Sequence, residues 1–126
     1  MINAGAIMCA SLIKPNASLS ERFDFIMRAW SSLSGGERPG FDNSVYLSEK
    51  DTADRNFALA YFMRQSRAFP DDTDLMKTLD FYFMCCSITV NCPQMETVAA
   101  TFANGGVCPL TSSRVFPARR RRTACR

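Results

Sequence analysis

The chain has 126 residues, of which 47% are hydrophobic, so it can hold the core of one domain but not of two. The net charge of +3 is uneven: residues 116–126 hold five arginines and no acid, while the rest holds ten basic and twelve acidic side chains. Histidine is absent, which excludes Ser-His-Asp and Cys-His catalysis within the chain and any His-ligated metal.

The first third of the chain predicts two helices. Residues 2–14 form an apolar segment that ends at Lys14-Pro15, because proline disfavours helix at the residue before it. Ser18-Leu19-Ser20-Glu21 is a capping box, and apolar residues follow it at helical spacing. Gly35-Gly36 ends this second helix.

The middle of the chain is organised around Ser48–Asn56, a charge-dense stretch that runs directly into an apolar helix. We expect a loop over residues 35–42 and a short helix from Ser44 to Lys50, with Val45 and Leu47 facing inward. The pattern alone favours a solvated turn with a helix cap for Ser48–Asn56. The alternative is that its polar groups line a cleft.

The second half predicts three further helical features. A helix runs from about Thr52 to Arg67, and Pro70–Thr73 is a turn with a helix cap. The following helix carries one apolar face, made of Leu75, Met76, Leu79, Tyr82, Phe83 and Cys86. Residues 88–90 either extend it or form extended chain. The fold class is therefore mainly α.

The last predicted helix starts at Cys92-Pro93, with proline at its first position, and ends at residues 104–106. It carries an apolar set made of Met95, Val98, Ala99 and Phe102. We expect one partial domain over residues 1–115 and a disordered tail over residues 116–126. The first and last helices are apolar on most of their faces, which indicates a part of a larger assembly.

The cysteines and the N-terminus indicate an intracellular protein. The six cysteines contain no CxxC pair, which favours reduced thiols over a disulfide framework. No apolar run reaches the ~18 residues of a membrane span. The first ten residues lack the basic region of a signal peptide.

Two short motifs have competing interpretations. Ser11-Leu12-Ile13-Lys14 is a Ser-x-x-Lys, which on one helical face would let the amine deprotonate the serine. We favour a chance match, because the motif is short and Pro15 follows directly. The run Arg119–Arg122 is typical of phosphate contacts, but we favour an unstructured tail because no aromatic residue interrupts it.

Several longer motifs, taken together, resemble one family. They are Asn3-Ala4-Gly5-Ala6-Ile7, Ser11–Lys14, Ser48-Glu49 with Asp54–Ala58, Asp80–Phe83 with Cys86–Ile88, and Ala99–Thr101 with Ala103–Gly106 and Cys108-Pro109. They closely resemble the glutaminases of the serine-dependent β-lactamase-like fold, with the animal kidney and liver types nearest. The resemblance is collinear from residue 1 to about Val115.

The resemblance implies hydrolysis of L-glutamine to L-glutamate and ammonia, through a serine acyl-enzyme and without a cofactor or metal. It also implies four substrate-binding residues, namely Asn3, Glu49, Asn56 and Tyr82. The Glu49 carboxylate suits the substrate's ammonium group. The two amides suit its α-carbon substituents, and Tyr82 offers a phenol. Such a site would reject amides that lack the two charges.

The resemblance also implies what the chain lacks. The family's catalytic Ser-x-x-Lys matches no part of it, and the strands and catalytic tyrosine would follow Val115. We therefore expect the helical lobe of a β-lactamase/transpeptidase-like α/β fold, without its sheet and inactive alone. We expect a homo-oligomer (a tetramer in the family), no nucleic-acid or membrane partner, and a mitochondrial or alternatively cytoplasmic location. The alternative functions are a non-catalytic helical protein that associates with glutaminase subunits, and nucleic-acid binding by the arginine tail.

Overall fold

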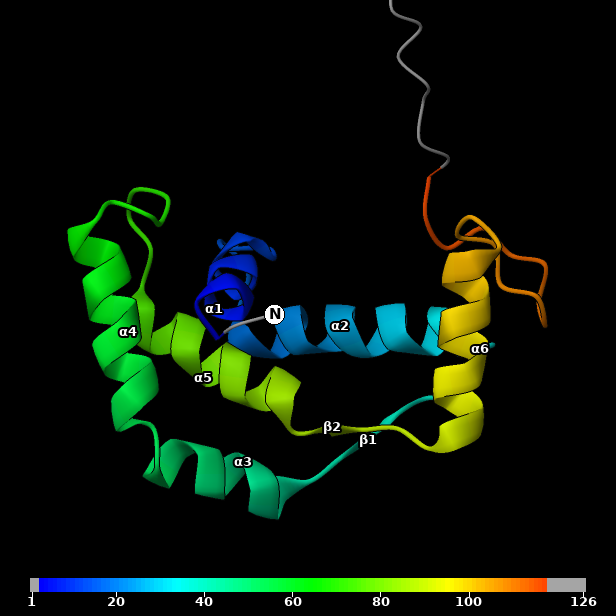
Figure 1. The fold of residues 1–126 in the computed structure, drawn as a ribbon, viewed down its shortest axis with the longest axis horizontal. Helices are drawn as coiled ribbons and strands as arrows, with labels where there is room; N and C mark the ends of the chain where they lie inside the picture. The colour runs from blue at the N-terminus through cyan, green and yellow to red at the C-terminus, as the bar shows by residue number, and fades with distance from the viewer. Residues whose placement is uncertain (1–2, 118–126) are drawn as a thin grey trace, which may run out of the picture. The chain divides into compact units, whose positions relative to one another are not determined.

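A computed structural model describes residues 3–117, which are mainly helical, as predicted (Figure 1). The contacts divide the chain into two compact units. The first contains the described residues up to Ile26 together with Gly40–Thr89, and the second contains Met27–Pro39 and the described residues from Val90. The helices are α1 (Asn3–Leu12), α2 (Leu19–Leu33), α3 (Asn43–Asp51), α4 (Asp54–Gln65), α5 (Leu75–Cys86) and α6 (Cys92–Ala103).

Helix α1 lies at the centre of the first unit, where it packs against both α4 and α5. Ile7 and Ala10 are buried there, which explains the apolar character of this segment. The helix ends at Leu12, and Lys14 takes the left-handed conformation (φ 43°) that ends many helices. The predicted break at Lys14-Pro15 is thus close to the observed one.

The predicted capping box at the start of α2 is confirmed. The Ser18 backbone N–H donates to Glu21 Oε2 (2.9 Å), and the Glu21 backbone N–H donates to Ser18 Oγ (3.3 Å). The predicted end is confirmed as well, since Gly35 and Gly36 have positive φ. The Gly36 N–H donates to the Ser31 carbonyl (2.7 Å), which closes the last turn.

Helix α3 forms as predicted, but its predicted inward face is wrong. Asp42 caps it by accepting from the backbone N–H groups of Ser44 and Val45. Val45 and Leu47 are 41% and 52% exposed, whereas Tyr46 packs against the core. Residues two apart share one face of a strand but point to nearly opposite sides of a helix. Val45 and Leu47 therefore could not both face inward from a helix.

Helix α5 supplies most of the core of the first unit, because α1, α3 and α4 all pack on it. Phe81 and Phe83 are essentially inaccessible to solvent. The predicted single face is only partly right, since Met76 and Cys86 are exposed. Contacts on several sides bury a wider surface than one stripe. The cap is Asp74, which accepts from the Lys77 N–H (3.1 Å), and it follows the predicted turn directly.

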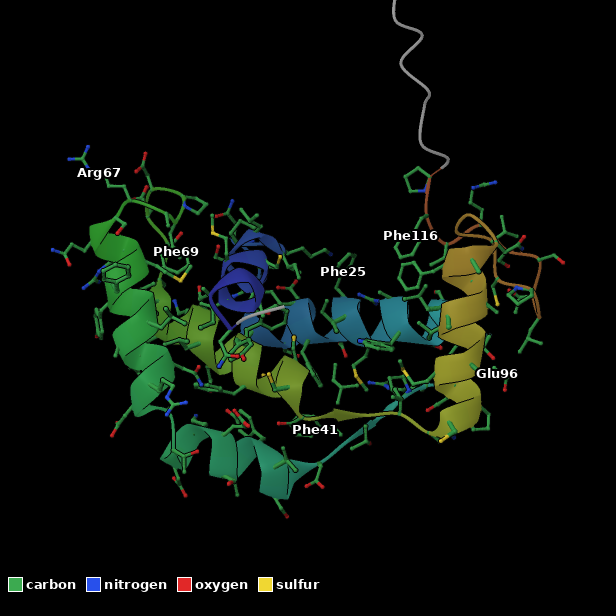
Figure 2. The ribbon with its side chains drawn as sticks, viewed as in Figure 1. Phe25, Phe41, Arg67, Phe69, Glu96 and Phe116 are labelled. Carbon is green, nitrogen blue, oxygen red and sulfur yellow. The ribbon has the colours of Figure 1, made fainter. Side chains whose placement is uncertain are left out.

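Two short strands also belong to the first unit. Strand β1 (Gly40–Phe41) falls in the predicted loop, and β2 (Ile88–Thr89) shows that this segment is extended chain. They pair antiparallel, with Phe41 opposite Ile88 and Gly40 opposite Thr89. Phe41, labelled in Figure 2, packs its ring edge against Phe23, with the ring centroids 5.3 Å apart.

The second unit is built on α6 and the end of α2. Asn91 and Gln94 form a reciprocal capping box, so Pro93 is the second helical residue rather than the first. The hydroxyl of buried Thr101 donates to the Leu33 carbonyl (3.1 Å). Val98 is buried as expected.

The exposed side of α6 differs from the prediction. Met95 and Phe102 are both exposed, and the ring of Phe116 stacks on that of Phe102 with centroids 5.3 Å apart (Figure 2). Phe116 belongs to the predicted tail, and residues 118–126 of that tail, with the arginine run, lie outside the described residues. Disorder of residues 116–126 stays a prediction.

Three further properties of residues 3–117 bear on function: membrane crossing, metal binding and the state of the cysteines. No helix of residues 3–117 has both the length and the apolarity to cross a membrane. Within the same stretch, no three His, Cys, Asp or Glu side chains are grouped so that they could hold a metal ion. The described cysteines are all free thiols: Cys9, Cys85, Cys86, Cys92 and Cys108.

The capping box of α2 gives a test of the fold. Replacing Ser18 with alanine removes the N-cap acceptor and should lower the free energy of unfolding by about 1 kcal/mol. Urea unfolding followed by circular dichroism measures this change. Ser32→Ala is the matched control, because its hydroxyl donates only to the Arg28 carbonyl on the exposed side of the same helix. An equal loss of stability in both variants would contradict a special role of the cap.

Candidate functional site

The four residues expected to bind substrate come from four helices of the first unit. Asn3 is the first residue of α1, Glu49 is in the last turn of α3, Asn56 is in the first turn of α4, and Tyr82 is in α5. These helices pack on one another, with α5 in contact with the other three. The fold thus gathers residues that are up to 79 positions apart into one unit.

One pair of these residues is bonded directly. Asn3 Nδ2 donates to Asn56 Oδ1 at 2.9 Å, which joins the start of α1 to the start of α4. Asn56 is only 8% exposed, whereas Asn3 is exposed. The bond leaves an acceptor on Asn3 and donors on Asn56. The two amides are therefore oriented and still able to bind a polar ligand.

The environment of Tyr82 keeps its phenol protonated. Burial raises the pKa of Tyr82, and the thiol of Cys86 one turn later and the carboxylate of Glu49 raise it further. Cys86 is exposed as a residue, but desolvation by its neighbours raises the pKa of its thiol, which interacts with the Tyr82 hydroxyl and with the Glu49 charge. Glu49 on α3 thus acts on Tyr82 and Cys86 of α5. At neutral pH the phenol is a hydrogen-bond donor.

These groups suit a small zwitterionic ligand. Glu49 is half-buried and supplies a negative charge, while its neighbours Tyr82 and Cys86 are neutral at pH 7. A partly desolvated carboxylate binds an ammonium group more strongly than one fully in water. The amides of Asn3 and Asn56 can both donate and accept.

A second polar group lies beside Glu49 and was missed by the sequence analysis. The Tyr46 hydroxyl donates to Asp80 Oδ1 (2.7 Å), and Lys50 Nζ lies 2.9 Å from the same oxygen. Lys50 Nζ also donates to the Tyr46 hydroxyl oxygen (3.1 Å). The spacing of Tyr46 and Lys50 in the sequence indicated a shared helical face, but it gave no hint of Asp80.

The Ser-x-x-Lys motif of α1 does not form a catalytic pair. Ser11 is buried, and its hydroxyl donates to the Met8 carbonyl (2.7 Å). Lys14 lies beyond the end of the helix, and its Nζ is 4.8 Å from the centroid of the Phe25 ring. Lys14 is therefore not placed to deprotonate Ser11, which agrees with the chance match favoured above.

A pocket of about 410 Å³ elsewhere in the first unit contains none of the four expected residues. Its lining includes Asp71, Asp72, Lys77 and Arg22. Arg22 is buried and already engaged: it donates to the carbonyls of Ala10 and Ile13 and lies over the Phe81 ring. It therefore completes the C-terminal end of α1 rather than offering a free cation.

Comparison with known proteins identifies the family. The glutaminase family model matches residues 1–125. Glutaminase 3 of Caenorhabditis elegans is 51% identical over all of this chain, which covers 21% of that protein. The mitochondrial liver isoform of glutaminase from Rattus norvegicus is 44% identical over 94% of the chain, which covers 20% of it.

Solved structures agree with this result. A glutaminase from Bacillus subtilis, complexed with 6-diazo-5-oxo-L-norleucine, matches 93% of this chain with a TM-score of 0.83 and 30% identity. The match covers 37% of that structure. The chain thus spans about a fifth of its animal relatives and just over a third of the bacterial structure.

The thiol of Cys85 on α5 gives a test of how closely this helix is packed. Burial raises the pKa of Cys85 to about 12, so its reactive thiolate is scarce at pH 8 and grows tenfold with each pH unit toward 12. Iodoacetamide should modify the exposed Cys9 and Cys92 well before Cys85. Peptide mass spectrometry at pH 8 and pH 10 measures the order. Labelling of Cys85 as fast as Cys9 at pH 8 would contradict this environment.

Proposed function

Because the chain belongs to the glutaminase family, we propose that it supplies the glutamine-binding part of an enzyme that hydrolyses L-glutamine to L-glutamate and ammonia. The observation that carries the proposal is the arrangement around α5. One expected pair, Asn3 and Asn56, is hydrogen-bonded, and α3 and α5, which carry Glu49 and Tyr82, pack on each other. The proposal assigns Asn3, Glu49, Asn56 and Tyr82 as substrate-binding residues.

Each assigned residue has a role that follows from its chemistry. The carboxylate of Glu49 pairs with the α-ammonium group of glutamine. The amides of Asn3 and Asn56 bind the α-carboxylate and hold its orientation, and the protonated Tyr82 donates a hydrogen bond. A ligand that lacks the ammonium group leaves Glu49 unpaired, so the site selects the amino acid over a simple amide.

We place the nucleophile outside residues 3–117. Ser11 is occupied by the Met8 carbonyl and lacks a base, and the chain contains no histidine. In the intact enzyme a serine acyl-enzyme would carry the reaction without a cofactor, as the resemblance implies. We also propose a homo-oligomer, as the family resemblance implies. For its location we propose the mitochondrion, by analogy with the rat and mouse relatives, or alternatively the cytoplasm.

A second candidate function is association with glutaminase subunits without catalysis. The observation behind it is the exposure of large apolar side chains: Phe62 on α4 is 66% exposed, and Leu110 is 70% exposed. Co-purification of the chain with an intact glutaminase would support this candidate. A monomer that binds no apolar dye would contradict it.

The absence of an activated serine gives a direct prediction. Residues 1–126 should release no ammonia from L-glutamine above a buffer control, because Ser11 is not activated. A coupled glutamate dehydrogenase assay measures ammonia at micromolar sensitivity. Activity above the control that disappears in Ser11→Ala would overturn the placement of the nucleophile.

Binding of glutamine tests the assigned residues. Glu49→Gln should weaken L-glutamine binding by roughly 10- to 100-fold, because a hydrogen bond to a charged group is lost. Asn56→Ala should weaken it as well, because it removes both the ligand contact and the bond to Asn3. NMR titration of the ¹⁵N-labelled chain measures the Kd.

Lys14→Met is the matched control for this titration. It removes a charge from the same unit at a side chain that lies over the Phe25 ring and is none of the four assigned residues. Its Kd should equal that of the unsubstituted chain. Equal weakening in Lys14→Met and Glu49→Gln would indicate a non-specific disturbance of the fold and contradict the assignment of Glu49.

A further inference from the structure

Helix α3 carries Glu49 but is weakly anchored by apolar contacts. It contains no fully buried residue, and its apolar Val45 and Leu47 face solvent. At its start, the Asp42 N–H donates to the Ser87 carbonyl at the end of α5 (2.9 Å). That bond lies almost two helical turns before Glu49, so it does not by itself orient the C-terminal turn of α3.

The C-terminal turn is fixed by a closed triangle of polar atoms. Tyr46 Oη and Lys50 Nζ both reach Asp80 Oδ1, at 2.7 and 2.9 Å, and lie 3.1 Å from each other. The hydrogen bond to Asp80 raises the pKa of Lys50, which therefore stays cationic at neutral pH. The Tyr46 ring also packs on Phe41 with centroids 5.9 Å apart.

Glu49 lies between Tyr46 and Lys50 in the sequence of α3. Glu49 directly precedes Lys50 and lies one turn after Tyr46, so any movement of that turn moves its carboxylate. On α5, Asp80 and Tyr82 are two residues apart and point to nearly opposite sides of the helix, so the triangle acts on Glu49 through the placement of α3 and not through Tyr82.

We propose that Tyr46, Lys50 and Asp80 are positioning residues that set the Glu49 carboxylate for the ammonium group of the substrate. This inference rests on the proposed function, because it assumes that Glu49 binds that group. The three residues do not touch the ligand themselves. They hold the part of α3 that carries Glu49 against α5.

The test compares two ligands of the full 126-residue chain. One is L-glutamine, and the other is 4-carbamoylbutanoate, which is glutamine without the α-amino group. The ratio of their Kd values, from NMR titration, measures what Glu49 contributes. A variant that merely loosens the fold weakens both ligands together, whereas a misplaced Glu49 weakens glutamine alone.

Tyr46→Phe is the sharpest variant, because it keeps the ring and removes only the hydroxyl. It should lower the preference for glutamine by about fivefold, a typical effect for one hydrogen bond to a charged group that acts indirectly. Asp80→Asn should lower it more, since it also releases Lys50. Lys50→Arg should retain the preference, because it keeps the cation, whereas Lys50→Met should lose it.

The matched control is Lys77→Met, which breaks an exposed ion pair with Asp74 at the start of the same helix (3.3 Å). It should leave the preference unchanged. If Glu49→Gln abolishes the preference but Tyr46→Phe and Asp80→Asn keep it, the positioning role is wrong and the proposed function stands. If the unsubstituted chain shows no preference for glutamine, both are overturned.

Discussion

The packing of α1, α3 and α4 on α5 is the constraint on which the first unit depends. Phe81, Phe83 and Leu79 are the most buried side chains of α5, and each large apolar side chain removed from water contributes roughly 1.5–3 kcal/mol. The same helix carries Tyr82 on a neighbouring face. Stability and ligand chemistry therefore share one element, and a change in the core of α5 also displaces the residues assigned to the substrate.

Much of the fold was accessible from the sequence, because local signals specify it. The capping box at Ser18 and the glycines at Gly35-Gly36 predicted the start and end of α2, and both act through bonds within a few residues. The family resemblance, carried by the motifs around Asn3, Ser48 and Asp80, is confirmed by the family model and by the solved structures. These features need no knowledge of how the helices pack.

The errors in the prediction have one origin, which is tertiary packing. The sequence predicted that Val45 and Leu47 are buried, but the side chain of α3 that packs against the core and against β1 is Tyr46. Phe81 was left out of the predicted face of α5 because a single stripe does not describe a helix packed on several sides. The triangle joins Asp80 to residues 30 and 34 positions earlier in the sequence. No pattern in a single sequence predicts a contact between residues so far apart along the chain.

The close approach of the two short strands has a consequence for how this segment can evolve. Gly40 lies opposite Thr89, and a β-carbon at position 40 would collide with the Thr89 hydroxyl. The hydroxyl is the atom in the way, since the Thr89 β-carbon would stay at ordinary van der Waals distance (3.7 Å). Positions 40 and 89 should therefore covary among relatives. A residue larger than glycine at position 40 becomes acceptable only where the residue at position 89 has no hydroxyl.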